Sequence, residues 1–405
     1  MSNASKQPGP ILLVSGHPLN WHAGASSLFL HLEKALRTEG AEVTCLHSGD
    51  YQKSYAGALS KLTVPRQVQR RVLPISGDYA VIDVAGNIAC SLFEKLTSRP
   101  RSQRPLLVNR LHGLEFKDEQ ASITEEIAGQ LRLPWKYKNF SRHVINAREK
   151  RAIGAADIVV CSSSRDADAI VAAGWKKREC IEVMAPGVLP EFLTVERNYT
   201  RGDRLLWWGS WVERKGANYL AETFELALRD VPELKLTVGG AGKAPEVILR
   251  EFSEAVRSRV RVLGFVSPET HRKELQSHDI FLFPSISEGF GLALVEAMAS
   301  SMPAVTTFTG LAHDWLEHGE NCLMVPMAAP SSTARAVVRL ARSEELREKL
   351  GKNAQAVAQK LSWGDLARNS LSTYYKGLCC LREKRECFDF TLHNSGAAVR
   401  VDRNT

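Results

Sequence analysis

The sequence lacks the long apolar runs, the cysteine pairs and the leader pattern that mark several classes of protein. No apolar run approaches the roughly 18 to 20 residues that a membrane-spanning helix needs. The N-terminal region shows no basic start followed by an apolar run and a cleavage site, so we expect no secretory signal. The 8 cysteines are scattered without a Cys-x-x-Cys pair, which favours reduced thiols over a disulfide or zinc framework. We therefore expect a cytoplasmic protein.

Acidic side chains are outnumbered, since 45 Asp and Glu stand against 53 Lys and Arg and give a net charge of +8. The basic excess is densest at residues 132–151, where aromatic side chains are interleaved with the cations. Such a stretch could rest on anionic lipid headgroups or attract an anionic acceptor, or it could be an ordinary solvated helix face. No nucleic-acid-binding motif accompanies it, so we expect no nucleic acid partner. The cations are Arg132, Lys136, Lys138, Arg142, Arg148, Lys150 and Arg151, and the aromatic residues are Trp135, Tyr137 and Phe140.

Short apolar runs alternate with helical patterns along most of the chain. An apolar content of 44% is ample for packed cores, and the length allows one to three domains. The alternation predicts an α/β protein with doubly wound parallel sheets. The expected strands of the first half lie at residues 11–14, 42–46, 79–84, 106–108, 157–161 and 181–184, and those of the second at 205–208, 234–238, 261–263, 281–283, 303–307 and 322–326.

The pattern of residues 11–38 predicts a strand at 11–14, a loop through Trp21 and His22, and a helix over 26–38. This order opens a Rossmann-like unit, but the Gly-x-Gly-x-x-Gly fingerprint of a dehydrogenase is absent. A nicotinamide-dependent dehydrogenase is therefore a poor hypothesis for this chain.

Two further patterns in the first half resemble ligand-binding or metal-binding sites. His112 follows an apolar run, where parallel sheets bind ligands, although a lone histidine is more often structural. Asp166 and Asp168 imitate a metal-binding Asp-x-Asp, but on a helix their side chains diverge and cannot hold one ion. We interpret these two aspartates as surface charge.

The stretch at 281–298 predicts strand, tight turn and helix, and it carries Glu288 in the turn and Glu296 in the helix. The first amides of a helix have no internal partner, so the N–H groups of residues 290–292 could bind a phosphate. Carboxylates beside such a site suit the hydroxyls of a sugar or ribose. Equally, an acid at a helix start stabilises the helix dipole by about 0.3 to 1 kcal/mol without any ligand.

The whole string Pro-Ser-x-x-Glu-Gly-Phe-Gly-Leu-x-x-x-Glu-Ala-Met-Ala resembles the paired-glutamate motif of family 4 of the retaining glycosyltransferases, which have the GT-B fold. This resemblance implies two Rossmann-like domains facing a cleft, a nucleoside diphosphate sugar as donor, a sugar, glycan or lipid-linked acceptor, and no cofactor or obligatory metal. It is weak in the first half of the chain and strong from Gly209 to Pro326.

The resemblance also implies roles for particular residues. The catalytic candidates are His112 and Glu288 at the donor sugar, with Lys215 and Arg214 at the diphosphate. In the loop at 209–216 the family often has an arginine where this chain has Ser210, and Arg214 is our candidate to replace that charge. The donor-binding candidates are Gly24 in the first loop, Ser210, Gly264 and Val266 near the nucleobase, Gly289, Phe290, Gly291 and Leu292 at the diphosphate, and Glu296 at the ribose.

The expected domains are 1–188 on the acceptor side, 189–362 on the donor side, and 363–405 as a crossing helix with a flexible tail. The polar stretch at 195–203 is interpreted as a hinge or linker. We favour a transferase of polysaccharide or glycolipid biosynthesis, with contact to an anionic membrane as an open possibility. The alternative is a protein of the same fold that binds nucleotide sugars with weak or regulatory activity, which the Ser210 departure motivates.

Overall fold

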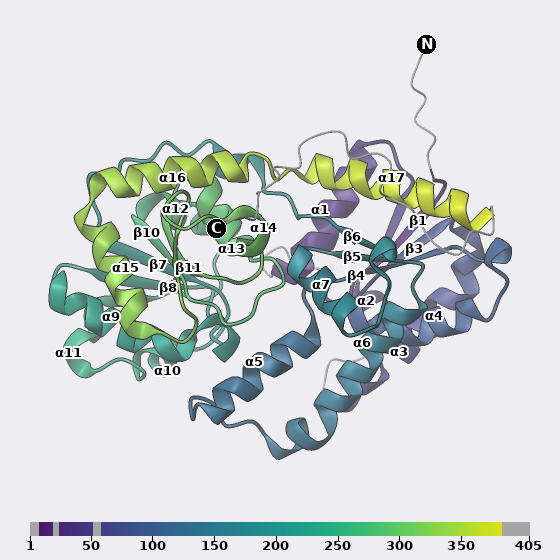
Figure 1. Ribbon diagram of the computed structural model, residues 1–405, viewed down its shortest axis with the longest axis horizontal. Coiled ribbons are helices and arrows are strands. Elements are labelled where there is room, and N and C mark those ends of the chain that lie inside the picture. Colours follow the sequence, from purple (N-terminus) through teal and green to yellow (C-terminus); the bar gives the residue numbers. More distant parts are fainter. Residues whose placement is uncertain (1–7, 19–23, 52–57, 383–405) are drawn as a thin grey trace, which may run out of the picture.

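The computed structural model describes residues 8–18, 24–51 and 58–382. Trp21, His22 and the tail beyond residue 382 lie outside these ranges. The chain forms two parallel six-stranded sheets that lie side by side in Figure 1, as the alternating pattern predicts. The first sheet has the order β2-β1-β3-β4-β5-β6. Its strands are β1 (Ile11–Val14), β2 (Val43–Leu46), β3 (Val81–Ala85), β4 (Leu106–Arg110), β5 (Ile158–Cys161) and β6 (Ile181–Val183).

Helices cover both faces of the first sheet and make two cores. One core packs α1 and the C-terminal helix against the sheet, and the other packs α3, α4, α6 and α7. The strands are mostly apolar because both faces of the sheet are covered, and the exceptions include Asp83 of β3 and Arg110 of β4, which are buried. The helices are α1 (Gly24–Thr38), α2 (Ser48–Tyr51), α3 (Ala58–Val72), α4 (Cys90–Thr97), α5 (Glu115–Ile127), α6 (Arg142–Ala155), α7 (Ser164–Ala172) and α8 (Pro190–Leu193).

The second sheet repeats this plan with the order β12-β11-β10-β7-β8-β9. Helices α9 and α15 pack on one face, and α13 and α16 on the other. Its strands are β7 (Arg204–Trp208), β8 (Lys235–Gly239), β9 (Val260–Val262), β10 (Ile280–Phe283), β11 (Ala304–Thr307) and β12 (Leu323–Val325). Its helices are α9 (Ala217–Asp230), α10 (Pro245–Leu249), α11 (Glu254–Arg257), α12 (Pro268–Ser277), α13 (Leu292–Ala299), α14 (Ala312–Trp315), α15 (Pro330–Arg342) and α16 (Glu344–Ala358).

Helix α17 (Trp363–Arg382) follows the second domain in sequence yet packs on the first sheet, as the crossing helix of the resemblance implies. Figure 1 shows it running along the top of the first domain. Its Tyr374 is fully buried and donates a hydrogen bond to Asp83 of β3 at 2.6 Å. The two halves of the chain are thereby joined by a polar contact inside an apolar core.

The segment at 195–203, which its composition marks as a hinge or linker, lies docked on the second domain. The guanidinium of Arg197 donates to the backbone oxygens of Ser300, Leu275 and His278, and the hydroxyl of Tyr199 is buried against Ser301. A polar sequence is therefore docked on the second domain, because the long arginine reaches carbonyl groups that would otherwise stay unpaired.

The interpretation of Asp166 as surface charge is wrong. Its side chain is 2% exposed and pairs with Lys117 of α5 at 2.5 Å. Burial is the main cause that raises the pKa of Asp166, and Lys117 opposes it. Asp166 therefore fastens α5 to α7, a tertiary pairing that helical spacing cannot reveal. Among the described residues, no helix is long and apolar enough to cross a membrane.

Candidate functional site

The stretch at 281–298 folds as strand, turn and helix, as predicted. Strand β10 ends at Phe283, and α13 begins at Leu292 after Gly291. Gly291 has φ 100°, a left-handed conformation that favours glycine, and no side chain caps the helix. Leu294 donates to the carbonyl oxygen of Gly291, so the amides of Leu292 and Ala293 are left for a ligand or for water.

The turn before α13 gathers the predicted cations around Glu288. The side chain of Glu288 is 5% exposed, and its Oε1 lies 2.5 Å from Nζ of Lys215 and 2.8 Å from Oγ of Ser285. Nη1 of Arg214 lies 4.0 Å from Oε2. Two cations and one buried carboxylate thus lie beside the uncapped start of α13. An added anion could bind both cations and the helix amides there.

Backbone contacts hold the loop of the two cations against the Glu288 turn. The N–H groups of Ile286 and Ser287 both donate to the carbonyl oxygen of Arg214, at 2.8 and 3.2 Å. Gly216 has φ 73°, and a Cβ atom there would stand 2.2 Å from the oxygen of Pro284. Glycine at 216 is therefore required for both the turn and the close approach. Ser210 lies at the exposed start of the same loop.

The two domains meet at His112 and Gly289. A Cβ atom on Gly289 would stand 1.6 Å from the carbonyl oxygen of His112, so the backbones touch. Both ring nitrogens of His112 are buried without a hydrogen-bond partner among the described residues. Burial is the main cause that lowers the pKa of His112 to about 3, with His17 and Arg110 adding to it. The imidazole is therefore neutral at physiological pH and available to a ligand at the junction.

Glu296 belongs to a neighbouring cluster that the sequence analysis missed in part. Its Oε2 lies 3.9 Å from Nε2 of His271, and His271 stacks on the indole of Trp208 with ring centres 4.1 Å apart. Nε2 of His271 is buried and has no hydrogen-bond partner within the described chain. No sequence signal marked His271, because its helix α12 reaches β7 and α13 only through the tertiary fold.

The remaining predicted residues lie on other loops. Gly264 and Val266 follow β9 at one edge of the second sheet, and Gly24 begins α1. No contact among the described residues joins these three to Glu288. They keep their predicted roles as expectations, and Gly264 is exposed.

The ionisation of Glu296 makes stability depend on pH. Burial is the main cause that raises the pKa of Glu296 from 4.5 to about 8, with Glu191 adding to it. The folded protein then holds this proton more tightly than the unfolded chain, so stability falls as pH rises from about 4.5 to 8. Because 27% of the side chain is exposed, we expect a loss of only about 1 to 2 kcal/mol.

Glu296→Gln should remove this loss. We expect the variant to melt at a higher temperature than the natural protein at pH 8, and at the same temperature near pH 4.5. Thermal unfolding of both proteins at pH 4.5, 6.5 and 8 measures the difference. An equal difference at every pH would show that the carboxyl does not change its ionisation in this range.

Comparison with known proteins relates the second domain to a known family. Residues 202–343 match the family described as "Glycosyl transferases group 1". An uncharacterized glycosyltransferase of Methanocaldococcus jannaschii is 30% identical over 177 residues, which are 42% of this chain and 44% of that protein. The chain spans about half the length of the curated relatives that it matches first.

Solved structures extend the likeness to the whole fold. Sucrose-phosphate synthase from Thermosynechococcus elongatus has a TM-score of 0.74 at 18% identity, covering 92% of this chain and 100% of that one. Anabaena HepE in complex with UDP-glucose has a TM-score of 0.65 at 18% identity, covering 90% and 99%. Residues 202–343 of the second domain thus match the group 1 glycosyltransferase family, and the two domains together have the GT-B fold.

Proposed function

We propose that this protein is a retaining glycosyltransferase that moves a sugar from a nucleoside diphosphate sugar to an acceptor hydroxyl. The observation that carries the proposal is the group of Lys215, Arg214 and Glu288 at the uncapped start of α13. A diphosphate placed there meets two cations and the positive end of a helix dipole. The HepE structure with bound UDP-glucose supports a donor of this class.

The proposed reaction uses each of these groups. The diphosphate attracts Lys215 and Arg214, which frees Glu288 to accept hydrogen bonds from the donor sugar. The bond between the anomeric carbon and the phosphate oxygen breaks, and the acceptor oxygen bonds to the same face of that carbon. The acceptor proton passes to the leaving phosphate, so no protein nucleophile and no metal are required.

The other residues hold the donor on both sides of the diphosphate. Glu296 binds the ribose, with the unpartnered His271 beside it, and the loop of Gly264 and Val266 faces the nucleobase. Neutral His112 accepts or donates one hydrogen bond at the sugar, close to Gly289. The acceptor then enters from the side of the first domain.

The decisive experiment measures release of nucleoside diphosphate from UDP-, GDP- and ADP-sugars, with and without EDTA. We expect one donor to react, the reaction to survive EDTA, and Glu288→Gln to abolish it. Arg214→Ala should lower the rate by about 10²-fold or more if its charge replaces the one absent at Ser210. An unchanged rate in Arg214→Ala would remove that role from Arg214.

The same assay tests the alternative function. Tight binding of one nucleotide sugar without release, even with a crude acceptor extract, would identify a binding protein of this fold. Ser210 favours that outcome, because it places no charge at the exposed start of the loop. The absence of NAD(P) binding would dismiss the dehydrogenase hypothesis.

We further propose that the first domain touches an anionic membrane through residues 127–140. Ile127, at the end of α5, and Trp135 and Phe140, between α5 and α6, are 82%, 73% and 55% exposed, and exposed Arg132 and Lys136 lie in the same stretch. Exposed aromatic side chains next to cations suit a headgroup region. Some cations of the predicted cluster are neutralised, since Lys138 pairs with Glu126, Arg142 with Glu119 and Arg151 with Glu94.

With two cations left beside the aromatic residues, contact should be weak, at about 1 kcal/mol per cation. We expect flotation with anionic vesicles at low salt, little with neutral vesicles, and a loss in Trp135→Ala combined with Lys136→Glu. Phe308→Ala is the matched control, because Phe308 is an exposed aromatic residue on the second domain. Equal flotation of both variants would contradict this surface.

A further inference from the structure

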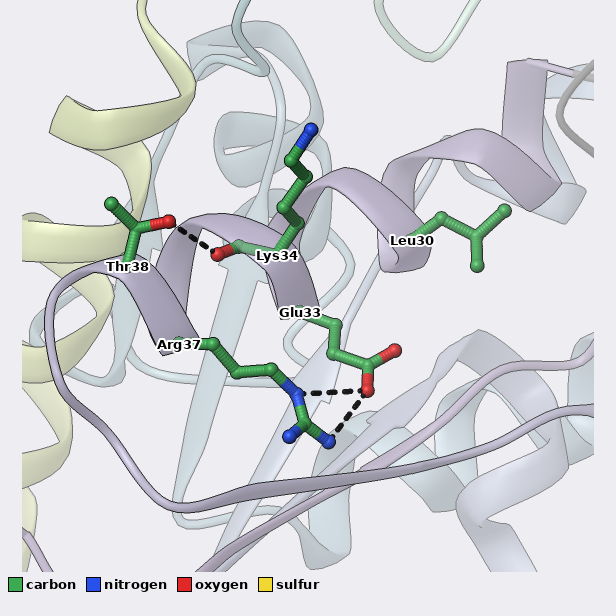
Figure 2. A pocket seen from close by; sticks show the side chains of 5 residues that line it. All are labelled: Leu30, Glu33, Lys34, Arg37 and Thr38. Carbon is green, nitrogen blue, oxygen red and sulfur yellow. Dashed lines mark hydrogen bonds and ion pairs between the residues drawn. The ribbon is translucent and has the colours of Figure 1, made fainter.

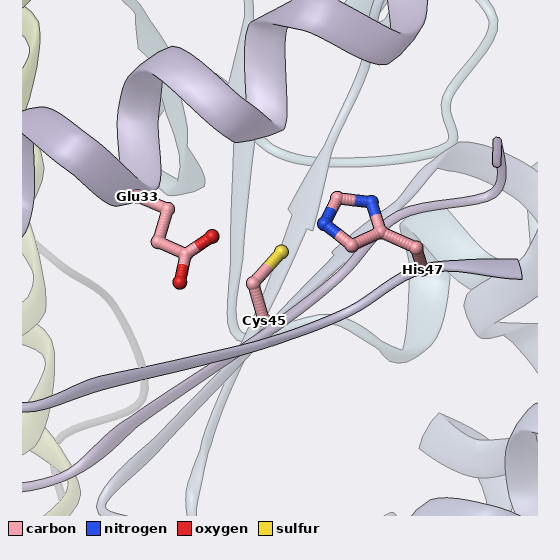
Figure 3. A group of neighbouring side chains, drawn as sticks. All are labelled: Glu33, Cys45 and His47. Carbon is pink, nitrogen blue, oxygen red and sulfur yellow. The ribbon is translucent and has the colours of Figure 1, made fainter. Parts of the chain in front are cut away.

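Three side chains of metal-ligand type meet on the first domain, away from the paired glutamates. Glu33 lies on α1, Cys45 on β2, and His47 directly after β2. Their ligand atoms all lie within 4.8 Å of one another, and Figure 3 shows the three side chains turned toward a common point. Positions 45 and 47 share one face because strand side chains alternate, and α1 contributes Glu33 from above that face.

Two of the three groups, His47 and Glu33, have bonding capacity that the described chain leaves unused. Nδ1 of His47 is buried and has no hydrogen-bond partner there. Both hydrogen bonds that Arg37 donates to Glu33 go to Oε1, as Figure 2 shows, so Oε2 is left for another partner. The surface pocket in Figure 2 is lined by residues of α1 alone, and Glu33 is one of them. Figure 3 shows the carboxylate of Glu33 on the side of Cys45.

The surroundings of Cys45 favour a cation. The carboxylates of Glu33 and Asp50 place negative charge near the Cys45 thiol, and the guanidinium of Arg37 offsets part of it. A metal ion would stabilise the thiolate and neutralise these acids. The proton of the thiol would then pass to solvent when the ion binds.

We propose that Glu33, Cys45 and His47 form a binding site for a divalent transition metal ion, zinc being the best match. A sulfur, an imidazole nitrogen and one carboxylate oxygen suit zinc, whereas magnesium and calcium require oxygen ligands. Bond lengths of about 2.0 to 2.3 Å place tetrahedral ligand atoms about 3.5 Å apart. The three side chains therefore need to close by about 1 Å, which rotation about their side-chain bonds supplies, and water completes the coordination.

The position of the site gives the ion a structural role. The turn after β2 is fixed by the N–H of His47, which donates to Asp50 at 2.7 Å, and by the N–H of Ser48, which donates to the carbonyl oxygen of His17 at 3.0 Å. On the other side, Phe29 of α1 packs edge-on against His112. An ion bound to Glu33, Cys45 and His47 would tie α1 to β2. Because Phe29 of α1 contacts His112, the ion would hold α1 close to that histidine.

The test is metal binding by the full chain, first stripped with chelator and then titrated with Zn²⁺ or Co²⁺ in the absence of any sugar donor. We expect one equivalent of metal, a sulfur-to-cobalt charge-transfer absorption band, and release of a proton. Cys45→Ser should abolish the band, and Glu33→Gln and His47→Asn should each weaken binding by about tenfold or more. Cys379→Ser, which removes a partly buried thiol on α17, should change neither.

Circular dichroism of each variant separates loss of a ligand from loss of the fold. If Cys45→Ser does not fold, the intensity of the cobalt band in folded Glu33→Gln and His47→Asn still decides the matter. A band that persists unchanged in all three variants, or no binding above the level of Cys45→Ser, would overturn the proposal. Retained transferase activity after removal of the metal would agree with a structural role.

Discussion

Lys215→Ala should lower the rate of sugar transfer by about 10²- to 10³-fold, since it removes a cation from the developing charge of the leaving diphosphate. Lys215 is the only lysine within ion-pairing distance of Glu288 among the described residues. Its ammonium also lies 5.4 Å above the ring of Phe283, which fixes the direction of the side chain. A preorganised charge of this kind acts mainly in the transition state, so kcat should fall more than KM rises.

Lys243→Ala provides the matched control, because Lys243 is an exposed lysine in the glycine turn after β8. Rates for both variants are measured with the donor that the natural protein accepts. Lys215→Arg should recover part of the rate, because it keeps the charge but not its position. A rate for Lys215→Ala within threefold of the natural rate would place the diphosphate elsewhere.

Removing Lys215 has a second consequence that the assay must separate from catalysis. Glu288 would stay buried with Ser285 and the more distant Arg214 as its partners. An uncompensated buried carboxylate is destabilising, so the turn before α13 could shift. Lys215→Ala combined with Glu288→Gln removes both charges, and its melting temperature should return toward that of the natural protein. Its rate should stay low, because the double variant still lacks the cation.

The sequence predicted the strands of both sheets because parallel strands covered on two faces are rich in apolar residues. It also predicted the turn with Glu288, since glycine at 289 and 291 and the helix formers after them act locally. Both predictions depend on residues that are close together in the sequence, which is why the sequence alone could make them. The structure adds that the backbones of His112 and Gly289 touch, which no local pattern contains.

What the sequence could not predict depends on contacts between distant segments. Asp166 has the spacing of a surface residue, but its partner Lys117 stands on another helix. His271 has no motif around it, and only the fold brings it to Glu296 and Trp208. The cluster of Cys45 escaped for a similar reason, because a search for cysteine pairs cannot see a ligand set built from a helix and a strand.

Asp83→Asn should destabilise the protein by about 3 to 5 kcal/mol, since it leaves Arg110 buried without its counter-charge. The side chains of Arg110 and Asp83 are 3% and 0% exposed, and Nη2 of Arg110 lies 2.8 Å from Oδ2 of Asp83. The same guanidinium reaches Ser370 and Tyr374 of α17, at 3.2 and 3.1 Å. Desolvation opposes the charge of Arg110, but Asp83 prevails and raises the pKa of Arg110.

Urea unfolding followed by circular dichroism measures the change in the free energy of unfolding. Tyr374→Phe should cost less, about 1 to 2 kcal/mol, because it deletes a hydroxyl without leaving an unpaired charge. Asp83→Leu combined with Arg110→Met should recover most of the loss, since a buried ion pair contributes little beyond an apolar pair of similar volume. A loss below about 1 kcal/mol in Asp83→Asn would mean that α17 is held by its apolar face alone. The charged network would then serve only to select the register in which the crossing helix docks.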